Sequence, residues 1–288
     1  MTYHYRIVDV FTQTPLEGNP LAVFVDARGL RDATMQSIAR ELNLSETVFI
    51  FPSTRADCAA NVRIFTPTRE MLFAGHPTVG AAFVMLDEGM VPAGAGSFAL
   101  EEKVGRVPVR VEGSGRPLIW LTTPPIHDGP KFDRKVCAAA VGLSIDDLLE
   151  CEPQLLSAGN PTIFIPVKSK EAVDRAWMDM AGMAHFKNVH AEGGCVFVFA
   201  PVPEGAYSRM FAPEYGIIED PATGSSTGPL AAYMIRHKLA PNTPRFVSEQ
   251  GTKMGRRSLL HVRINDGSIE VGGYVTPLVR AEMRLGIE

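Results

Sequence analysis

Three titratable side chains stand beside turn-forming segments of this sequence. Glu46 follows Asn43-Leu44-Ser45 at the entrance of a β-rich run, His76 lies in Gly75-His76-Pro77-Thr78, and Asp220 precedes the glycine–serine segment 224–228. A carboxylate in a water-poor site tends to have a raised pKa, which suits it to accept and return a proton near neutral pH. These segments therefore predict proton transfer by side chains, with Glu46, Asp220 and His76 as catalytic candidates.

Each glycine-containing turn opens into an apolar segment, 79–86 after Gly75 and 229–235 after Gly224. Proline in a first turn and Ser or Thr just before it are typical of helix starts. Because these segments are apolar on nearly every side, we expect buried helices. The unpaired N–H groups and the positive dipole end of such a helix can bind a carboxylate or phosphate, and glycine lets the ligand approach the backbone.

Simpler interpretations of the same residues stay open from the sequence. The glycines would also permit tight packing of a buried helix. Glu46 could be a capping or surface glutamate, and Asp220 could bond loop N–H groups as Asp does in turns. His76, Ser225 and Thr227 could each cap a helix, and this interpretation fits Thr227 better than Ser225.

Composition narrows the class of protein. The chain has 288 residues and a net charge of −4, which gives no electrostatic case for nucleic acid or acidic membranes. No stretch reaches the roughly 20 apolar residues of a membrane span, and the first residues lack a signal-peptide core. The four cysteines are scattered, so we expect no disulfide framework, no metal site and a cytoplasmic location. No nucleotide-binding or metalloprotease motif is present, so we expect no cofactor.

Hydrophobic periodicity predicts a mixture of short strands and helices. An amphipathic helix is expected to begin at Asp32, and further helices at 79–86, 134–140, 145–150 and 229–235. Glu219 and Asp220 are expected in a turn-rich loop. Strands are expected at 5–11, 21–25, 47–51, 62–65, 97–100, 106–111, 118–122, 162–166, 195–200, 207–211, 245–248, 259–264 and 268–271.

The chain repeats itself at close to half its length. Gly18-Asn19-Pro20 recurs as Gly159-Asn160-Pro161, Arg63-Ile64-Phe65 as Arg209-Met210-Phe211, and Gly75-His76-Pro77-Thr78 as Gly224-Ser225-Ser226-Thr227. The offsets between the matched segments are 160 − 19 = 141, 209 − 63 = 146 and 224 − 75 = 149. They differ by only a few residues, which short insertions in loops would explain. We therefore expect two homologous halves, each a strand-rich shell around one buried helix, with the two helix starts facing a shared cleft.

Long segments carry a family resemblance. They are DVFTQTPLEGNPLAVF, ARELNLSET, RIFTPTREMLFAGHP, RMFAPEYGIIEDPATGSSTGPLA and GRRSL. Together they resemble the phenazine-biosynthesis isomerase family (PhzF-like), which shares the diaminopimelate epimerase fold. The resemblance implies an α+β fold of two epimerase-like domains, each a β-barrel-like sheet around a buried central helix. The expected limits are 1–125, completed by strands at about 275–288, and 126–274.

The resemblance also implies a cofactor-free enzyme, usually a homodimer, with its site between the domains. The epimerases use two cysteines, whereas the matching turns here carry His76 and Ser225, so two-thiol epimerisation is disfavoured. Carried over, Glu46 moves a proton from C3 to C1 of trans-2,3-dihydro-3-hydroxyanthranilate, and Asp220 and His76 orient the substrate. The substrate-binding candidates are Ser225, Gly75, Gly224, Asn19 and Thr227.

Substrate choice stays open within this family. Gly228-Pro229-Leu230 matches the phenazine enzymes, whereas Pro221 stands where those enzymes carry alanine. Proline restricts the backbone of the preceding Asp220. The alternatives are an isomerase acting on another small carboxylated metabolite and a non-catalytic binding protein on the same fold.

Overall fold

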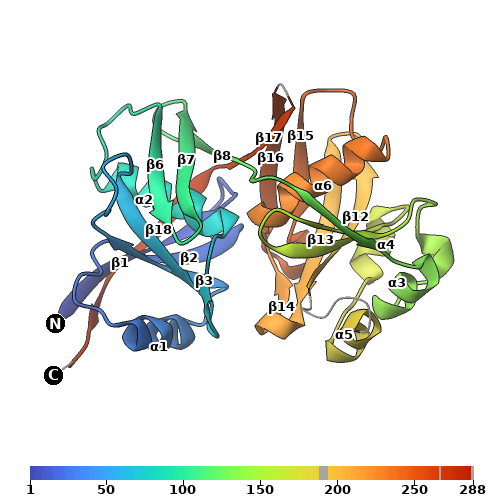
Figure 1. Cartoon of the computed structure of the whole chain (residues 1–288), viewed down its shortest axis with the longest axis horizontal. Helices are drawn as coiled ribbons and strands as arrows, with labels where there is room; N and C mark the ends of the chain where they lie inside the picture. Colours follow the sequence, from blue (N-terminus) through green and yellow to red (C-terminus); the bar gives the residue numbers. More distant parts are fainter. Residues whose placement is uncertain (188–193, 266, 287–288) are drawn as a thin grey trace. The chain divides into compact units, whose positions relative to one another are not determined.

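The structure, a computed structural model, describes residues 1–187, 194–265 and 267–286. The chain divides into two compact units, which are described separately. Unit 1 comprises Met1–Thr122 and Gly272–Glu288, and unit 2 comprises Thr123–Val271. The domain limits expected from the sequence, at residues 125 and 274, stay predictions. Both units combine short strands with a few helices, so the fold is a sheet-rich α+β fold (Figure 1).

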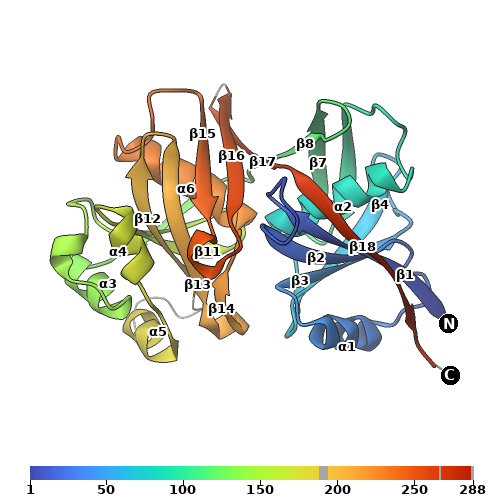
Figure 2. The same ribbon diagram turned by 180° about the vertical axis from the view of Figure 1, so that it is seen from behind.

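Unit 1 is built from one sheet in which the two ends of the chain lie side by side. β1 pairs antiparallel with β18, and Figure 2 shows the two strands running together. β1 also pairs antiparallel with β2, which is parallel to β3. The strands are β1 (Thr2–Val10), β2 (Asn19–Phe24), β3 (Glu46–Phe51), β4 (Ala60–Phe65), β5 (Glu70–Met71), β6 (Ser97–Glu102), β7 (Gly105–Glu112), β8 (Leu118–Thr122) and β18 (Val275–Arg284).

The pairings of unit 1 recur in unit 2 in the same order. In unit 1 they are β1–β2 antiparallel, β2–β3 parallel, β3–β4 antiparallel, β4–β5 antiparallel, β4–β6 parallel and β6–β7 antiparallel. In unit 2 they are β10–β11, β11–β12, β12–β13, β13–β14, β13–β15 and β15–β16, with the same directions. The strands are β9 (His127–Lys131), β10 (Gln154–Ser157), β11 (Pro161–Pro166), β12 (Cys195–Val202), β13 (Gly205–Ala212), β14 (Ile217–Asp220), β15 (Arg245–Gln250), β16 (Ser258–Asn265) and β17 (Ser268–Gly273).

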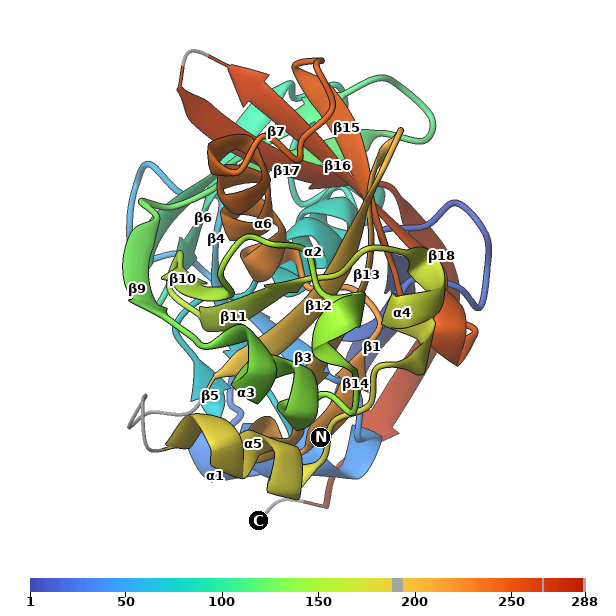
Figure 3. The same cartoon turned by 90° about the vertical axis from the view of Figure 1, so that its right-hand side faces the viewer.

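Helices cover the two faces of the parallel strands in each unit. In unit 1, α1 (Asp32–Leu42) links β2 to β3 and packs Met35 and Ile38 against Phe24, Phe49 and Phe65. In unit 2, α4 (Lys170–Arg175) packs against β12 and β13, and α3 (Arg134–Ala140) packs against α5 (Met180–Lys187) (Figure 3). Side chains of all three helices join one core with β11, β12 and β13. Alternate residues of β12 point into two cores, Val196 and Val198 toward these helices and Phe197 and Phe199 toward α6 (Gly224–Arg236). Such strands are apolar on both faces because both faces are covered.

The two remaining helices are buried, as the sequence predicts. Every residue of α2 (Gly75–Asp87) from Gly75 to Met85 is buried, and the helix packs against β1, β2, β3, β4, β8 and β18. Gly80 permits this close approach, because a Cβ there would lie 2.4 Å from Leu21 Cδ2. α6 packs in the same way against β10, β11 and β16 of unit 2.

Several boundaries differ from the sequence-based expectation. Both buried helices begin earlier, at Gly75 and Gly224, so Pro229 is the sixth helical residue rather than a first-turn residue. The carbonyl of Ser225 therefore receives no helical bond from Pro229, which has no N–H. Asp220 ends the strand β14 instead of lying in a loop. The helix expected at 145–150 is a single 3-10 turn, η1 (Ile145–Asp147).

Some elements were not predicted because their sequences are short or polar. They are β5, β9, β10, β14, α4 and α5. β5 and β14 are hairpin returns held by their pairing with β4 and β13, which local periodicity does not record. Within the described residues, none of the helices has the length and apolar character needed to cross a membrane.

Candidate active site

Unit 1 brings together the candidates Asn19, Glu46 and His76. Glu46 is the first residue of β3 and His76 the second residue of α2, and Glu46 Oε2 lies 3.4 Å from His76 Nε2. The side chains are 13% and 4% exposed, so both lie largely out of water. Asn19, at the start of β2, places its Nδ2 atom 3.4 Å from His76 Nδ1. Three segments that are distant in sequence thus meet at the His76 ring, and the Glu46 side chain beside it is largely out of water, so the interpretation of Glu46 as a surface residue is wrong.

The environment of His76 fixes its charge and its tautomer. Burial lowers the pKa of His76 to about 3, so the ring is neutral and its contact with Glu46 is not an ion pair. The Asn19 amide nitrogen can only donate a hydrogen bond, so His76 Nδ1 accepts and the ring proton lies on Nε2. Glu46 Oε2 lies next to that nitrogen, but the two atoms do not form a hydrogen bond. At 3.4 Å the contact is longer than an ordinary hydrogen bond.

The first turn of α2 keeps its N–H groups free of a side-chain cap. The N-cap residue is Ala74, which has no capping side chain, so His76 does not cap the helix. The Thr78 hydroxyl lies 2.7 Å from the Ala74 carbonyl oxygen, which also accepts the Thr78 N–H. The N–H groups of Gly75 and His76 lie at the positive end of the helix dipole, where a carboxylate binds favourably.

Unit 2 places Asp220 in a second polar cluster. Asp220 is 5% exposed, and its Oδ2 atom accepts a hydrogen bond from Thr223 Oγ1 at 2.5 Å. Gln250 donates through Nε2 to the Asp220 carbonyl oxygen at 2.7 Å and to Thr223 Oγ1 at 3.0 Å. Its Oε1 atom accepts the Thr223 N–H at 3.1 Å. Gln250 therefore fixes both the carboxylate residue and the N-cap of α6.

The remaining candidates lie in the first turn of α6. Gly224 and Ser225 are its first two residues and are partly exposed. The N-cap Thr223 makes no side-chain capping bond, because its hydroxyl is directed to Asp220. Thr227 is fully buried and its hydroxyl donates to the Thr223 carbonyl at 3.0 Å. Thr227 therefore does not cap the helix N–H groups, contrary to the interpretation that favoured it.

Glu102 was missed by the sequence analysis. It ends β6, is 3% exposed, and places Oε1 2.6 Å from Thr78 Oγ1. Burial raises the pKa of the Glu102 carboxyl to about 8, against a smaller lowering by the Thr78 hydroxyl. The internal repeat could have found it, because Glu101-Glu102 corresponds to Glu249-Gln250 once the offset is continued along the chain.

Strand register makes that correspondence specific. Glu101 pairs with Asn61 of β4, as Glu249 pairs with Tyr207 of β13. Arg63 and Arg209 mark the same register of β4 and β13, so Glu102 corresponds to Gln250. By the same reasoning, Glu46 and Cys195, which pair with Leu21 and Thr162, are equivalent residues. Met71 and Asp220 are equivalent through their partners Ile64 and Met210.

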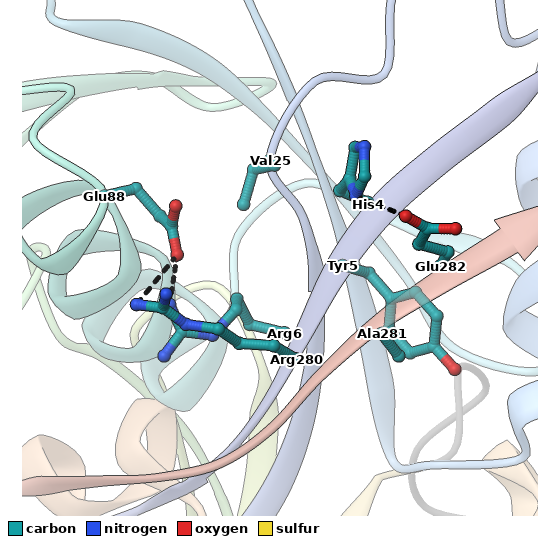
Figure 4. A pocket seen from close by; sticks show the side chains of 8 residues that line it. All are labelled: His4, Tyr5, Arg6, Val25, Glu88, Arg280, Ala281 and Glu282. Atoms are coloured by element: carbon teal, nitrogen blue, oxygen red, sulfur yellow. Dashed lines mark hydrogen bonds and ion pairs between the residues drawn. The ribbon is translucent and has the colours of Figure 1, made fainter.

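A separate pocket of about 440 Å³ in unit 1 contains none of the candidate residues (Figure 4). Its charged side chains are paired with one another. Arg6 bonds to Asp87 and Glu88, Arg280 approaches Glu88 at 3.7 Å, and His4 approaches Glu282 at 3.7 Å. Within the described part of the chain, no three His, Cys, Asp or Glu side chains are grouped so that they could hold a metal ion.

Known proteins share this fold along the whole chain. The sequence model of the phenazine biosynthesis-like protein family (PhzC-PhzF) matches residues 8–278. A trans-2,3-dihydro-3-hydroxyanthranilate isomerase from Pseudomonas aeruginosa is 33% identical over 278 residues, which cover 94% of this chain and 95% of that protein. The structure of a predicted epimerase from Pseudomonas aeruginosa superposes with a TM-score of 0.85 at 34% identity, covering 99% of this chain and 100% of the other.

A more distant structure shares the fold alone. It is a hydroxyproline epimerase from Agrobacterium vitis, with a TM-score of 0.65 at 12% identity, and it covers 98% of this chain and 92% of its own. The enzyme class follows from the nearer relatives, which are named isomerases at 33% and 35% identity. The chain belongs to the phenazine biosynthesis-like (PhzF) family, and it is an isomerase.

Proposed function

We propose that this isomerase converts trans-2,3-dihydro-3-hydroxyanthranilate by acid–base proton transfer without a cofactor. The observation that carries the proposal is the partly buried Glu46 carboxylate beside the neutral His76 ring, which Asn19 holds in one tautomer. A base that is held in place and has little water around it can take a proton and return it within the same site. The P. aeruginosa relative, whose name gives that substrate, supports the choice.

In the proposed reaction Glu46 accepts the proton from C3 and the ring double bonds shift. The protonated Glu46 then delivers the same proton to C1 on the same face, so the carboxylate is regenerated. The enol that forms tautomerises to a ketone. His76 donates its Nε2–H toward the reacting side and stays neutral throughout, since burial lowers its pKa to about 3. Asp220 orients the substrate amino group.

The substrate carboxylate is assigned to the helix starts. We propose that Ser225 and the N–H groups of Gly75, His76 and Gly224 bind it, which agrees with the uncapped first turns of α2 and α6. Asn19 acts through His76, and a direct role of Asn19 or Thr227 in binding stays a prediction. Two homologous domains with barrel-like sheets around the central helices, a homodimer and a cytoplasmic location also stay predictions.

The decisive experiment follows one proton. Metal-stripped protein is incubated in deuterated water with substrate carrying hydrogen at C3, and consumption and the isotope at C1 are measured by NMR. Transfer by one carboxylate predicts that part of the C1 position retains hydrogen, whereas exchange with solvent places deuterium there. Glu46→Gln should lose turnover but still bind the substrate in calorimetry.

A matched control is Glu41→Gln, which changes the same functional group on the exposed side of α1 and should leave turnover unchanged. Turnover that persists in Glu46→Gln would refute the role of Glu46. If the wild type binds trans-2,3-dihydro-3-hydroxyanthranilate without turnover, the second candidate function is favoured, in which the substrate is another small carboxylated metabolite.

A further inference from the structure

The buried Glu102 carboxyl has a hydrogen-bonding arrangement that requires a proton. The Thr78 hydroxyl lies 2.6 Å from Glu102 Oε1 and 2.7 Å from the Ala74 carbonyl oxygen. A hydroxyl has one proton, and both neighbours are acceptors when Glu102 is ionised. If Glu102 is protonated, every contact has one donor and one acceptor: Glu102 donates to Thr78 Oγ1, and the Thr78 hydroxyl donates to the Ala74 carbonyl oxygen. The chain of bonds then closes the first turn of α2.

The second oxygen of Glu102 points to the same state. Glu102 Oε2 is buried and has no hydrogen-bond partner among the described residues. A buried carboxylate needs several donors to offset its lost hydration, whereas a carboxylic acid needs far fewer. The equivalent residue in unit 2 is the uncharged Gln250, which holds the start of α6 with both ends of its amide.

Charged neighbours do not compensate Glu102. Lys103, the next residue, bonds to Glu70 at 2.9 Å, and His76 on α2 is neutral. The other charged side chains on the adjoining elements are paired elsewhere: Asp87 of α2 with Arg6, Arg63 of β4 with Glu70 and Asp32, Arg106 of β7 with Asp57, and Arg110 of β7 with Glu112.

We propose that Glu102, in its protonated form, is a positioning residue for the first turn of α2, and that its ionisation weakens binding of the substrate carboxylate. The effect on the substrate rests on the proposed function, since it requires the Gly75 and His76 N–H groups to bind an anion. A negative charge one hydrogen bond from Thr78 opposes an anion at that turn. It also leaves Thr78 with two acceptors and one proton, which loosens the turn that carries His76.

The first test needs no substrate. Selective 15N labelling of glycine and threonine allows the Gly75 and Thr78 amide signals to be followed by NMR as pH rises. We expect both amides to titrate together with a midpoint near pH 8 in the wild type. Glu102→Gln should abolish that titration, because a glutamine amide donates to Thr78 without ionising. Glu101→Gln on the same strand is the control, and it should preserve the titration.

The second test measures binding and turnover separately. In the wild type, KM should be constant below the midpoint and rise about tenfold by about pH 9, one unit above it, since only the protonated form binds well. KM in Glu102→Gln should stay flat across that range, with kcat near the wild-type value, while Glu101→Gln should follow the wild type.

The outcomes separate the two proposals. Amides that do not titrate in the wild type, or that still titrate in Glu102→Gln, would overturn the assignment of Glu102. Titrating amides with a flat KM would overturn its effect on the substrate. If no turnover of trans-2,3-dihydro-3-hydroxyanthranilate occurs, the proposed function fails, and the amide titration alone decides the positioning role.

Discussion

The two units repeat their structural contacts but not their proton-handling residues. Arg63 on β4 bonds to Glu70 on β5 and lies over the Phe65 ring, 5.2 Å from Cζ to the ring centre. Arg209 on β13 bonds to Glu219 on β14 and lies over Phe211 at 4.9 Å. The same pair and the same ring contact thus hold the same hairpin in both units.

The residues around the helix starts differ instead. Glu46, His76 and Glu102 of unit 1 correspond to Cys195, Ser225 and Gln250 of unit 2, whereas Asp220 of unit 2 corresponds to Met71 of unit 1. Unit 1 therefore carries two carboxyl groups, Glu46 and Glu102, that unit 2 lacks, and unit 2 carries one, Asp220, that unit 1 lacks. A duplicated scaffold can keep its packing while the two copies of a site take up different chemistry, because the packing and the site use different residues.

The largest difference between equivalent positions is expected at Glu46 and Cys195. Glu46→Gln should lower kcat by about a thousandfold, the size of effect typical when a general base is removed. Cys195→Ala should change kcat by no more than about twofold, because Cys195 contacts Asn160 and takes no proton in the proposed reaction. Both are measured by initial rates on the same substrate. Similar losses in the two variants would mean that the units share the chemistry.

A second difference concerns stability in acid. The pKa of His76 is about 3 in the folded protein, well below its value in the unfolded chain. Between these two values, the unfolded chain binds a proton at His76 and the folded protein does not. Stability from this group is fully present above about pH 6.5 and falls by roughly 1.4 kcal/mol per pH unit as pH drops toward 3. His76→Gln should remove that slope in urea unfolding measured at several pH values.

Ser225→Ala, at the equivalent position of unit 2, should keep the wild-type acid slope because serine does not titrate there. His127→Gln, an exposed histidine substitution, is the control for loss of the side chain itself. An unchanged slope in His76→Gln would show that His76 is protonated or hydrated in the folded protein, contrary to its burial.

The third comparison exchanges the strand-end residues. Gln250→Glu should destabilise the protein by about 2–4 kcal/mol at about pH 8, since a buried carboxylate cannot donate to the Asp220 carbonyl or to Thr223. The loss should shrink at about pH 5, where a raised pKa would keep the new carboxyl protonated. Urea unfolding at both pH values measures it, with the exposed Gln13→Glu as the control. A loss that does not depend on pH would mean that the shape of the side chain matters more than its charge.

Local sequence patterns record part of this arrangement. The two buried helices were predictable because a helix that is apolar on every side is stable only when it is buried in the core. The position of Glu46 at the start of a strand was predictable from the β-rich run that follows it. The helix starts were harder, because Gly, His, Pro and Ser are weak helix formers whose place in α2 and α6 is decided by packing against the surrounding strands.

Contacts between distant segments were not predictable from those patterns. Asn19 and His76 are 57 residues apart, and their hydrogen bond exists because β2 and α2 pack together. The hydrogen bond between Glu102 and Thr78 also joins distant segments. It depends on the parallel pairing of β6 with β4, because this pairing fixes the position of Glu102 at the end of β6. In the sequence, Glu102 looks like an ordinary surface glutamate of an alternating strand. Only its equivalence with Gln250 distinguishes it from Glu101.

The smallest expected difference lies in the repeated ion pair itself. The Arg209–Glu219 side chains are 7% and 11% exposed, against 25% and 16% for Arg63–Glu70. Glu219→Gln should therefore cost about 2–3 kcal/mol, since it leaves a buried guanidinium with fewer partners. Glu70→Gln should cost about 1 kcal/mol or less, because Arg63 is nearer to water and keeps Asp32 at 2.7 Å. Urea midpoints measured side by side give the difference. Equal losses would show that burial does not set the strength of this pair, and that the carbonyl groups of Val173 and Asp174, which also bind Arg209, replace the carboxylate fully.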